Sequence, residues 1–126
     1  MLMSSAVFAA DGVSLESRRA YNSSNATATR LASSVKGIEV ELKNNTAEEK
    51  KLSFILVKFE DGVCKGVAIA DTVTASTLET KKIALDCGSI SGIDTLKCIV
   101  VEAGESGYYP IIDEVNVFTN KGWKAE

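Results

Sequence analysis

Short apolar runs separated by turn-forming residues constrain the fold of this chain more than any other feature. After Lys36, the apolar residues Ile38, Val40 and Leu42 alternate with charged residues, which is the period-two pattern of a strand with one buried face. Comparable runs recur at intervals of about 8 to 15 residues, and no stretch of about ten residues carries a convincing helical period. The pattern therefore predicts an all-β protein.

The longest apolar run predicts the central strand. Leu52 to Phe59 is mostly β-branched, aliphatic or aromatic and is apolar on both faces, as expected of a central strand in a two-sheet packing. Glu60-Asp61-Gly62 follows with an Asp-Gly pair, which is a strong signal for a tight hairpin turn. Val63 to Val73 is then expected to return as the partner strand, so that the two runs form one hairpin.

Four more strands are predicted from similar runs. Polar or glycine-rich segments separate them, including a turn at Asn44-Asn45-Thr46, a solvated connection or single helical turn at 47–51, and a polar break at 74–76. The expected strands are Val13 to Tyr21, Leu78 to Asp86 with a bulge at Lys81-Lys82, Leu96 to Val101, and a last strand that the segment at 108–112 leads into and that extends to Phe118.

Six or seven short strands of this kind are typical of an antiparallel two-sheet sandwich of the immunoglobulin-like type, and a small β-barrel is the competing architecture. The expected domain spans 36–119, after a signal-like segment at 1–10 and a polar segment at 11–35 and before a tail at 120–126. The residues expected in the core are Ile38, Val40, Leu42, Phe54, Leu56, Ile83, Leu85, Cys98 and Val100.

The composition of the chain argues against several classes of function. The 126 residues correspond to one domain. A total of 14 Lys and Arg against 17 Asp and Glu gives a net charge of −3, unlike the basic surface that binds nucleic acid. Histidine is absent, which removes the most common general base and the most common metal ligand. We therefore expect no enzyme activity, no cofactor or metal site, and no nucleic-acid partner.

The N-terminus predicts export. Met1 to Ala10 is apolar or small in character, and Val7-Phe8-Ala9 supplies the small residues that signal peptidase requires, with Ala9 before the cut. No Lys or Arg precedes Arg18, so the segment is either the end of a signal peptide with an earlier start or a short lead that imitates one. No other stretch has the roughly 20 apolar residues of a membrane span. We expect a secreted or cell-surface protein.

The three cysteines, Cys64, Cys87 and Cys98, form no Cys-x-x-Cys pair, and no histidine is present to complete a zinc site. If the protein is exported, three cysteines can form at most one disulfide, and their spacing leaves all three pairings open. Each lies in an apolar context within or beside an expected strand, so we predict that they are small buried hydrophobes.

Six short motifs follow one another along the chain. They are Leu42-Lys43-Asn44-Asn45-Thr46, Phe54 to Phe59, Asp61-Gly62, Thr77 to Lys82, Lys97 to Val101, and Tyr109-Pro110-Ile111. In this order, the chain over roughly residues 36–113 resembles β-sandwich modules, immunoglobulin-like and fibronectin type III-like, of surface and exported proteins of clostridia and related bacteria. That family carries an aromatic residue near the end of the Lys-initiated strand, where this chain has Val101. The resemblance implies a non-catalytic spacer or adhesion module.

Three aromatic residues near the C-terminus are the candidate ligand-binding residues. Tyr108, Tyr109 and Trp123 could stack on sugar rings while Asp113 or Glu114 accepts hydrogen bonds from hydroxyl groups. The alternative is that they pack against an edge of the sandwich, as aromatic residues before a proline commonly do. This site predicts a carbohydrate-binding module as the alternative function.

Our leading hypothesis from the sequence is a non-catalytic structural or interaction module that acts through strand edges and loops. An exposed sheet edge is able to pair with another copy or with a partner's strand, because its backbone groups are unpaired. The expected partners are a protein or a cell-wall polysaccharide at the cell surface.

Overall fold

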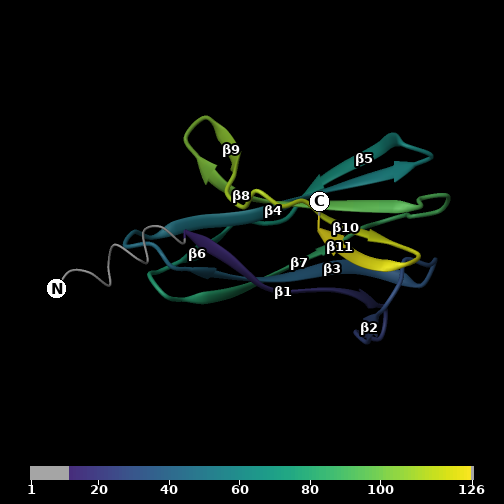
Figure 1. Cartoon of the computed structure of the whole chain (residues 1–126), viewed down its shortest axis with the longest axis horizontal. Helices are drawn as coiled ribbons and strands as arrows, with labels where there is room; N and C mark the ends of the chain where they lie inside the picture. Colours follow the sequence, from purple (N-terminus) through teal and green to yellow (C-terminus); the bar gives the residue numbers. More distant parts are fainter. Residues whose placement is uncertain (1–11, 126) are drawn as a thin grey trace.

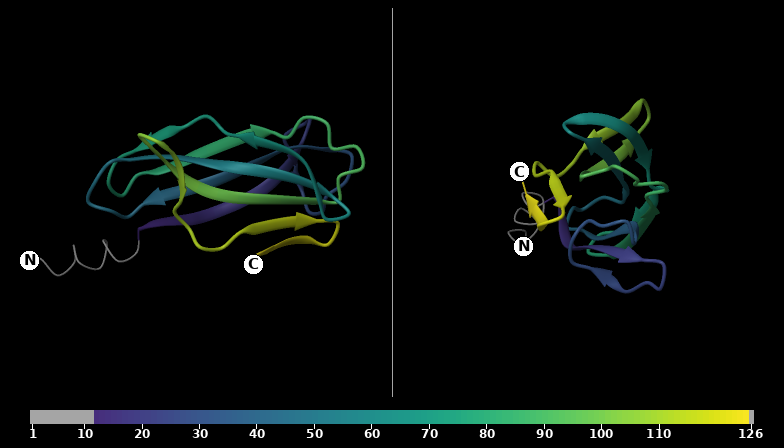
Figure 2. Two further views of the ribbon diagram at one scale, coloured as in Figure 1. Left: turned by 90° about the horizontal axis from the view of Figure 1, so that it is seen from above. Right: turned by 90° about the vertical axis from the view of Figure 1, so that its right-hand side faces the viewer.

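The computed structural model describes residues 12–125, and the signal-like segment at 1–10 lies outside this part of the chain. Between residues 12 and 125 the regular structure consists only of β-strands, which form two antiparallel sheets packed face to face (Figure 1, Figure 2). The predicted all-β sandwich is confirmed.

The smaller sheet, sheet A, has the strand order β2-β1-β3-β7, and the larger, sheet B, has the order β11-β10-β8-β4-β5. Two short strands lie off this path, because β6 also pairs with β4 and β9 also pairs with β8. The strands are β1 (Val13–Asn22), β2 (Thr27–Ala28), β3 (Val35–Asn44), β4 (Lys50–Glu60), β5 (Val63–Ile69), β6 (Val73–Ala75), β7 (Thr80–Asp86), β8 (Thr95–Gly104), β9 (Gly107–Pro110), β10 (Asn116–Thr119) and β11 (Gly122–Ala125).

The order of the principal strands is immunoglobulin-like. Sheet A places β1, β3 and β7 side by side, and sheet B places β10, β8, β4 and β5 side by side. These positions correspond to strands A, B and E of an immunoglobulin domain on one sheet, and to strands G, F, C and C′ on the other.

The hairpin of β4 and β5 is built as expected. Asp61 and Gly62 both have positive φ angles, 50° and 78°, which are the two left-handed positions that a tight hairpin turn requires.

The core lies between the two sheets. Side chains alternate along β4, so that Phe54 and Leu56 are fully buried there. Of the nine predicted core residues, eight are buried, and Leu85 is only partly buried against the core.

Two details around β6 and β7 differ from the predictions. The expected polar break at 74–76 contains β6, which pairs with the beginning of β4. The expected bulge at Lys81-Lys82 is absent, since β3 and β7 pair without a register shift. Leu78 lies in the turn before β7, with a φ of 64° and 47% exposure. Leu78 precedes the strand by two residues, so its apolar side chain is not part of the alternation of β7 and no bulge is needed.

The segment from Tyr108 to Phe118, where a lead-in and one last strand are predicted, contains two strands. β9 pairs with the last part of β8 and β10 pairs with its first part, so both lie along the same edge of β8. β11 forms a hairpin with β10 where a tail was expected, through a turn that ends at Gly122 with a φ of 94°. The sandwich thus includes β11 and also β1, which both lie outside the range predicted for the domain.

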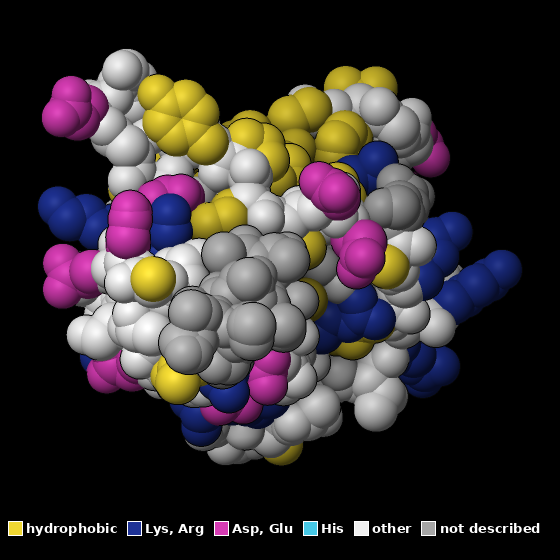
Figure 3. Space-filling model, turned by 60° about the vertical axis from the view of Figure 1, so that its left-hand side comes forward, with side chains coloured by type: hydrophobic (Ala, Val, Ile, Leu, Met, Phe, Trp, Pro, Cys, Tyr) yellow, Lys and Arg dark blue, Asp and Glu magenta, His cyan; other side chains and the backbone are white. Residues whose placement is uncertain are grey.

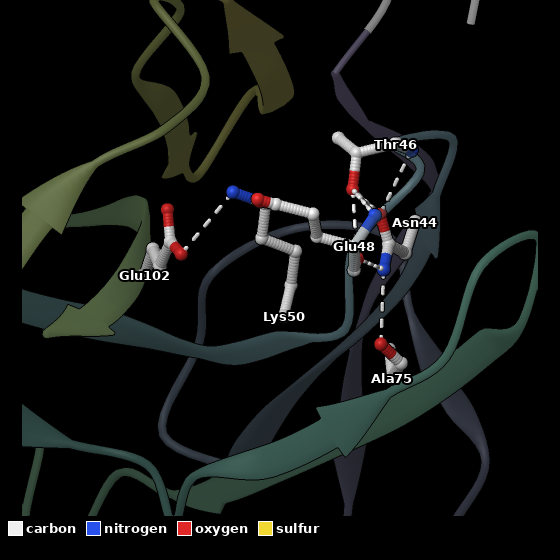
Figure 4. Close-up of polar contacts among 6 residues, drawn as sticks. All are labelled: Asn44, Thr46, Glu48, Lys50, Ala75 and Glu102. Carbon is white, nitrogen blue, oxygen red and sulfur yellow. Dashed lines mark hydrogen bonds and ion pairs between the residues drawn. The ribbon is translucent and has the colours of Figure 1, made fainter. Parts of the chain in front are cut away.

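A buried amide ties one end of the sandwich together (Figure 4). Asn44 is fully buried at the end of β3, and its Nδ2 donates to the carbonyl oxygens of Ala75 at 2.9 Å and Glu48 at 2.8 Å. Its Oδ1 accepts from the backbone N–H and the hydroxyl of Thr46, at 2.9 and 2.6 Å. All of the hydrogen-bonding capacity of the side chain is therefore used. One residue thus holds the turn between β3 and β4 against β6.

We predict that Asn44→Ala lowers the free energy of unfolding by about 2 to 3 kcal/mol, because buried carbonyl and N–H groups lose their partner. Urea denaturation followed by circular dichroism measures the loss. The matched control is Asn45→Ala at the next position, where the half-exposed amide makes one hydrogen bond of 3.1 Å to Ser14, and where we expect a loss of about 0.5 kcal/mol. Equal losses in the two variants would contradict the role given to Asn44.

Candidate functional site

The side chains of sheet B that point away from sheet A are largely apolar. Along β4, the half-buried residues Ile55, Val57 and Phe59 lie at alternate positions, opposite in direction to the buried Phe54 and Leu56, and strand alternation places them on the outer side of the sheet. Neighbouring strands add to them. The apolar face, as we name it, consists of Ile55, Val57, Phe59, Val67, Ile69, Ile99 and Tyr108.

The pairing of three strands arranges this face in rows. Ile55 of β4 lies between Ile69 of β5 and Ile99 of β8, so three isoleucines stand side by side across the sheet. Val67 is the direct neighbour of Val57 in the next row. Val67 is 60% exposed and Ile69 is 43% exposed, although both are large apolar side chains. No second sheet covers this face within the described residues.

The face lies in a hollow. The β9 hairpin and the hairpin of β4 and β5 both rise from sheet B on the side opposite sheet A (Figure 1). The space-filling view shows hydrophobic side chains gathered along the floor between these two raised parts (Figure 3). Contiguous apolar surface of this kind marks interaction sites in soluble proteins.

Basic residues border one end of the face. The Nζ of Lys97 lies 5.1 Å from the centroid of the Phe59 ring, which is a cation–π contact. Lys97 and Lys124 line a shallow pocket of about 330 Å³ together with Phe59, Val117 and Thr119. A ligand of the apolar face would therefore meet positive charge at this end.

The two predicted tyrosines are exposed but face opposite ways. Tyr108 and Tyr109 are neighbours on β9, so their side chains lie on opposite sides of the strand, and they are 43% and 51% exposed. Tyr108 pairs with Ala103 and borders the apolar face. The Tyr109 ring lies against Gly104, where an added Cβ would come within 2.5 Å of it. The two rings therefore do not form one flat platform.

The third predicted residue, Trp123, lies elsewhere. On β11 it packs against the core, with its ring centroid 4.8 Å from that of Phe118, and the Arg18 guanidinium lies 5.1 Å from the Trp123 ring. Phe118 pairs with Leu96 near the start of β8, whereas Tyr108 pairs with Ala103 near its end. The structure does not bring Trp123 to the two tyrosines, and sugar binding by any of them stays a prediction.

The three thiols are all free and differ in exposure. Cys87 and Cys98 are buried, as predicted, but Cys64 is exposed because it lies on the edge strand β5. Burial raises the pKa of the Cys98 thiol to about 12, and burial also raises the pKa of Cys87. Since the thiolate is the nucleophile, the two buried cysteines are poorly suited to covalent chemistry.

The sequence carries a signal for the apolar face in two of its strands. The run of β4 is apolar on both faces, and it predicted a central strand. Only one of these two faces packs against the other sheet. Alternation in β5, where Val67 and Ile69 flank Ala68, indicated a second strand with apolar residues on the same side.

Comparison with known proteins found no matching family model, no matching curated protein and no matching solved structure. In the described part of the chain, no helix is long and apolar enough to cross a membrane. Among the same residues, no three His, Cys, Asp or Glu side chains cluster as they would around a metal ion.

We predict that a thiol reagent such as Ellman's reagent labels only Cys64 in the native protein at mildly alkaline pH. Cys87 and Cys98 are buried and their raised pKa values leave little thiolate. Absorbance gives the number of thiols released, and denaturant should expose the other two. Cys64→Ser is the control and should remove the fast reaction. Rapid labelling of Cys98 in the folded protein would show that this strand opens easily.

Proposed function

We propose that the protein is a non-catalytic interaction module, secreted or displayed at the cell surface, that binds another protein through the apolar face. The observation that carries this proposal is the row of Ile55, Ile69 and Ile99 with the adjoining Val57 and Val67 on the outer side of three strands. Val67 and Ile69 are exposed, and the other three are half-buried. Leaving such side chains in water costs roughly 25 cal/mol for each Å² of apolar surface that a partner would bury.

The shape and charge of the face support a protein partner. The raised hairpins on either side of the hollow would contact the flanks of a bound segment, while the rows of isoleucine and valine contact its apolar side chains (Figure 3). Lys97 and Lys124 at one end favour a partner with carboxylates there. The ligand class that fits is therefore a segment with apolar residues followed by acidic ones.

The remaining parts of the proposal are supported by the sequence and by side-chain chemistry. A role at the cell surface is supported by the signal-like segment at 1–10 and by the resemblance to exported bacterial modules. A non-catalytic role is supported by the absence of histidine and by the raised pKa of the buried thiols of Cys87 and Cys98.

The test is binding of the purified chain to envelope fractions of the cells that encode it, measured by co-sedimentation. We predict that the double variant Ile55→Gln with Ile99→Gln lowers the apparent affinity about tenfold or more, since truncating two central apolar contacts typically costs at least 1 kcal/mol each. Both side chains are on the outer side of the sheet, so the core remains intact.

The matched control carries two glutamines on the opposite side of the sandwich. Glu41 and Lys82 are paired neighbours on the outer side of sheet A, and Glu41→Gln with Lys82→Gln should leave binding unchanged. Equal binding by the wild type and the Ile55 and Ile99 variant would contradict the proposal. Binding to protein-free sacculi that is lost on Tyr108→Ala would instead favour a carbohydrate ligand.

A further inference from the structure

β5 is the edge strand of sheet B, and it is less protected than the other edges. The edge strand β7 carries Lys81 and Lys82, and β1 carries Glu16 and Arg18 and is partly covered by β2. β11 is only four residues long. β5 has seven residues with Lys65 as its only charge, and its register against β4 shifts at Lys65. Charges, bulges and short length are the devices that keep edges from pairing, and the stretch from Gly66 to Ile69 carries none of them except its length of four residues.

The backbone of β5 presents hydrogen-bonding groups to this open edge. The Ala70 N–H donates to the Phe54 carbonyl at 3.0 Å, which marks this pair as hydrogen-bonded. Hydrogen-bonded pairs alternate in an antiparallel ladder, so the next one along β5 is at Ala68. The N–H and C=O groups of Val67 and Ile69 therefore point away from β4.

The residues along this edge are complementary to the same residues read in reverse. The segment from Lys65 to Asp71 has the sequence Lys-Gly-Val-Ala-Ile-Ala-Asp. It begins with a basic residue and ends with an acidic one, and between them small residues alternate with the two β-branched ones. A two-fold axis at Ala68 would place Val67 beside Ile69 of a second copy. It would also bring Lys65, at the register shift of β5, near Asp71 of that copy, which lies two residues beyond the end of β5. Ala68 would face its own equivalent, where a small side chain fits the closer spacing of a pair without hydrogen bonds.

We propose that β5 pairs antiparallel with β5 of a second copy of this chain, around a two-fold axis at Ala68. Val67 and Ile69 then exchange backbone hydrogen bonds with Ile69 and Val67 of the second copy, which matches the outward direction of their groups. The exposed side chains of these four residues form one apolar cluster across the new strand pair. Other registers lose this match: an axis at Val67 sets Lys65 beside Ile69.

The charges at the two ends select this register. Lys65 and Asp71 are both exposed, and neither forms an ion pair with the described residues of its own chain. Pairing at Ala68 creates a cross-strand pair of opposite charge at each end. The two B sheets become continuous, and their apolar faces join side by side. The inference therefore extends the proposed function: it uses the backbone edge of β5 together with Val67 and Ile69 of the apolar face, and leaves the rest of that face free.

Sedimentation velocity from micromolar to near-millimolar concentration tests the proposal on the chain under reducing conditions. We expect a reversible dimer. Lys65→Asp alone and Asp71→Lys alone each set like charges opposite each other at both ends, and should raise the dimer dissociation constant about tenfold. The double variant restores opposite charges and should dimerise like the wild type. An equimolar mixture of the two single variants should form a mixed dimer.

The control is Lys82→Asp on the edge strand β7, which should not change the dimer. A wild-type chain that remains monomeric at every concentration would overturn the proposal and leave the β5 edge to a strand of another protein. A dimer that is indifferent to both single charge reversals would overturn it as well. Neither result decides whether the apolar face binds a partner, because that binding is tested separately through Ile55 and Ile99.

Discussion

The pairing of β4 with β8 in the middle of sheet B is the interaction on which the rest of the structure depends. β4 also pairs with β5 and β6, and β8 also pairs with β9 and β10, so every strand of sheet B is paired directly with one of these two except β11. β11 in turn pairs with β10. The same alternation sends Phe54 and Leu56 into the core and Ile55 and Val57 to the outer side. The core and the candidate site are thus two faces of one strand pair.

At the ends of the sandwich, polar contacts join turns and strands to one another. Asn44 satisfies carbonyls of the turn and of β6 at one end, and the Lys50–Glu102 ion pair of 3.4 Å lies beside it (Figure 4). From β4, the Lys58 Nζ donates to the carbonyls of Cys87 and Ser89, which follow β7, at 2.9 and 3.2 Å. These contacts link sheet B to the segment after β7. The open β5 edge therefore belongs to a sandwich whose layers are already tied together.

Much of the fold could be predicted because its signals are local. Alternation in β3 and the Asp61-Gly62 turn depend only on residues that are close in sequence, and both are confirmed. The missed elements have weak local signals. β11 is four residues long and follows a turn without an Asn-Gly or Asp-Gly pair, and β6 has three residues that become a strand only by pairing with β4.

The candidate site was harder to predict because exposure is not a local property. Trp123 and Tyr108 are near in sequence, but β9 and β10 pair with separate parts of the β8 edge, and β11 pairs with β10. The two rings therefore lie near opposite ends of β8. Cys64 resembled a buried residue in its apolar context, yet it lies on an edge strand. Each outcome depends on which strand lies beside the residue, and that strand comes from a distant segment.

Alternation, turn residues and the number of apolar runs were enough to specify strands, a two-sheet core and most of its members, since these follow from the geometry of neighbouring residues along the chain. Tertiary structure decided which apolar side of β4 meets sheet A and which side faces solvent. It also decided that β5, with a single lysine among seven residues, lies at an edge. The physical reason is that burial and backbone pairing are completed by other segments, whose positions only the folded chain defines.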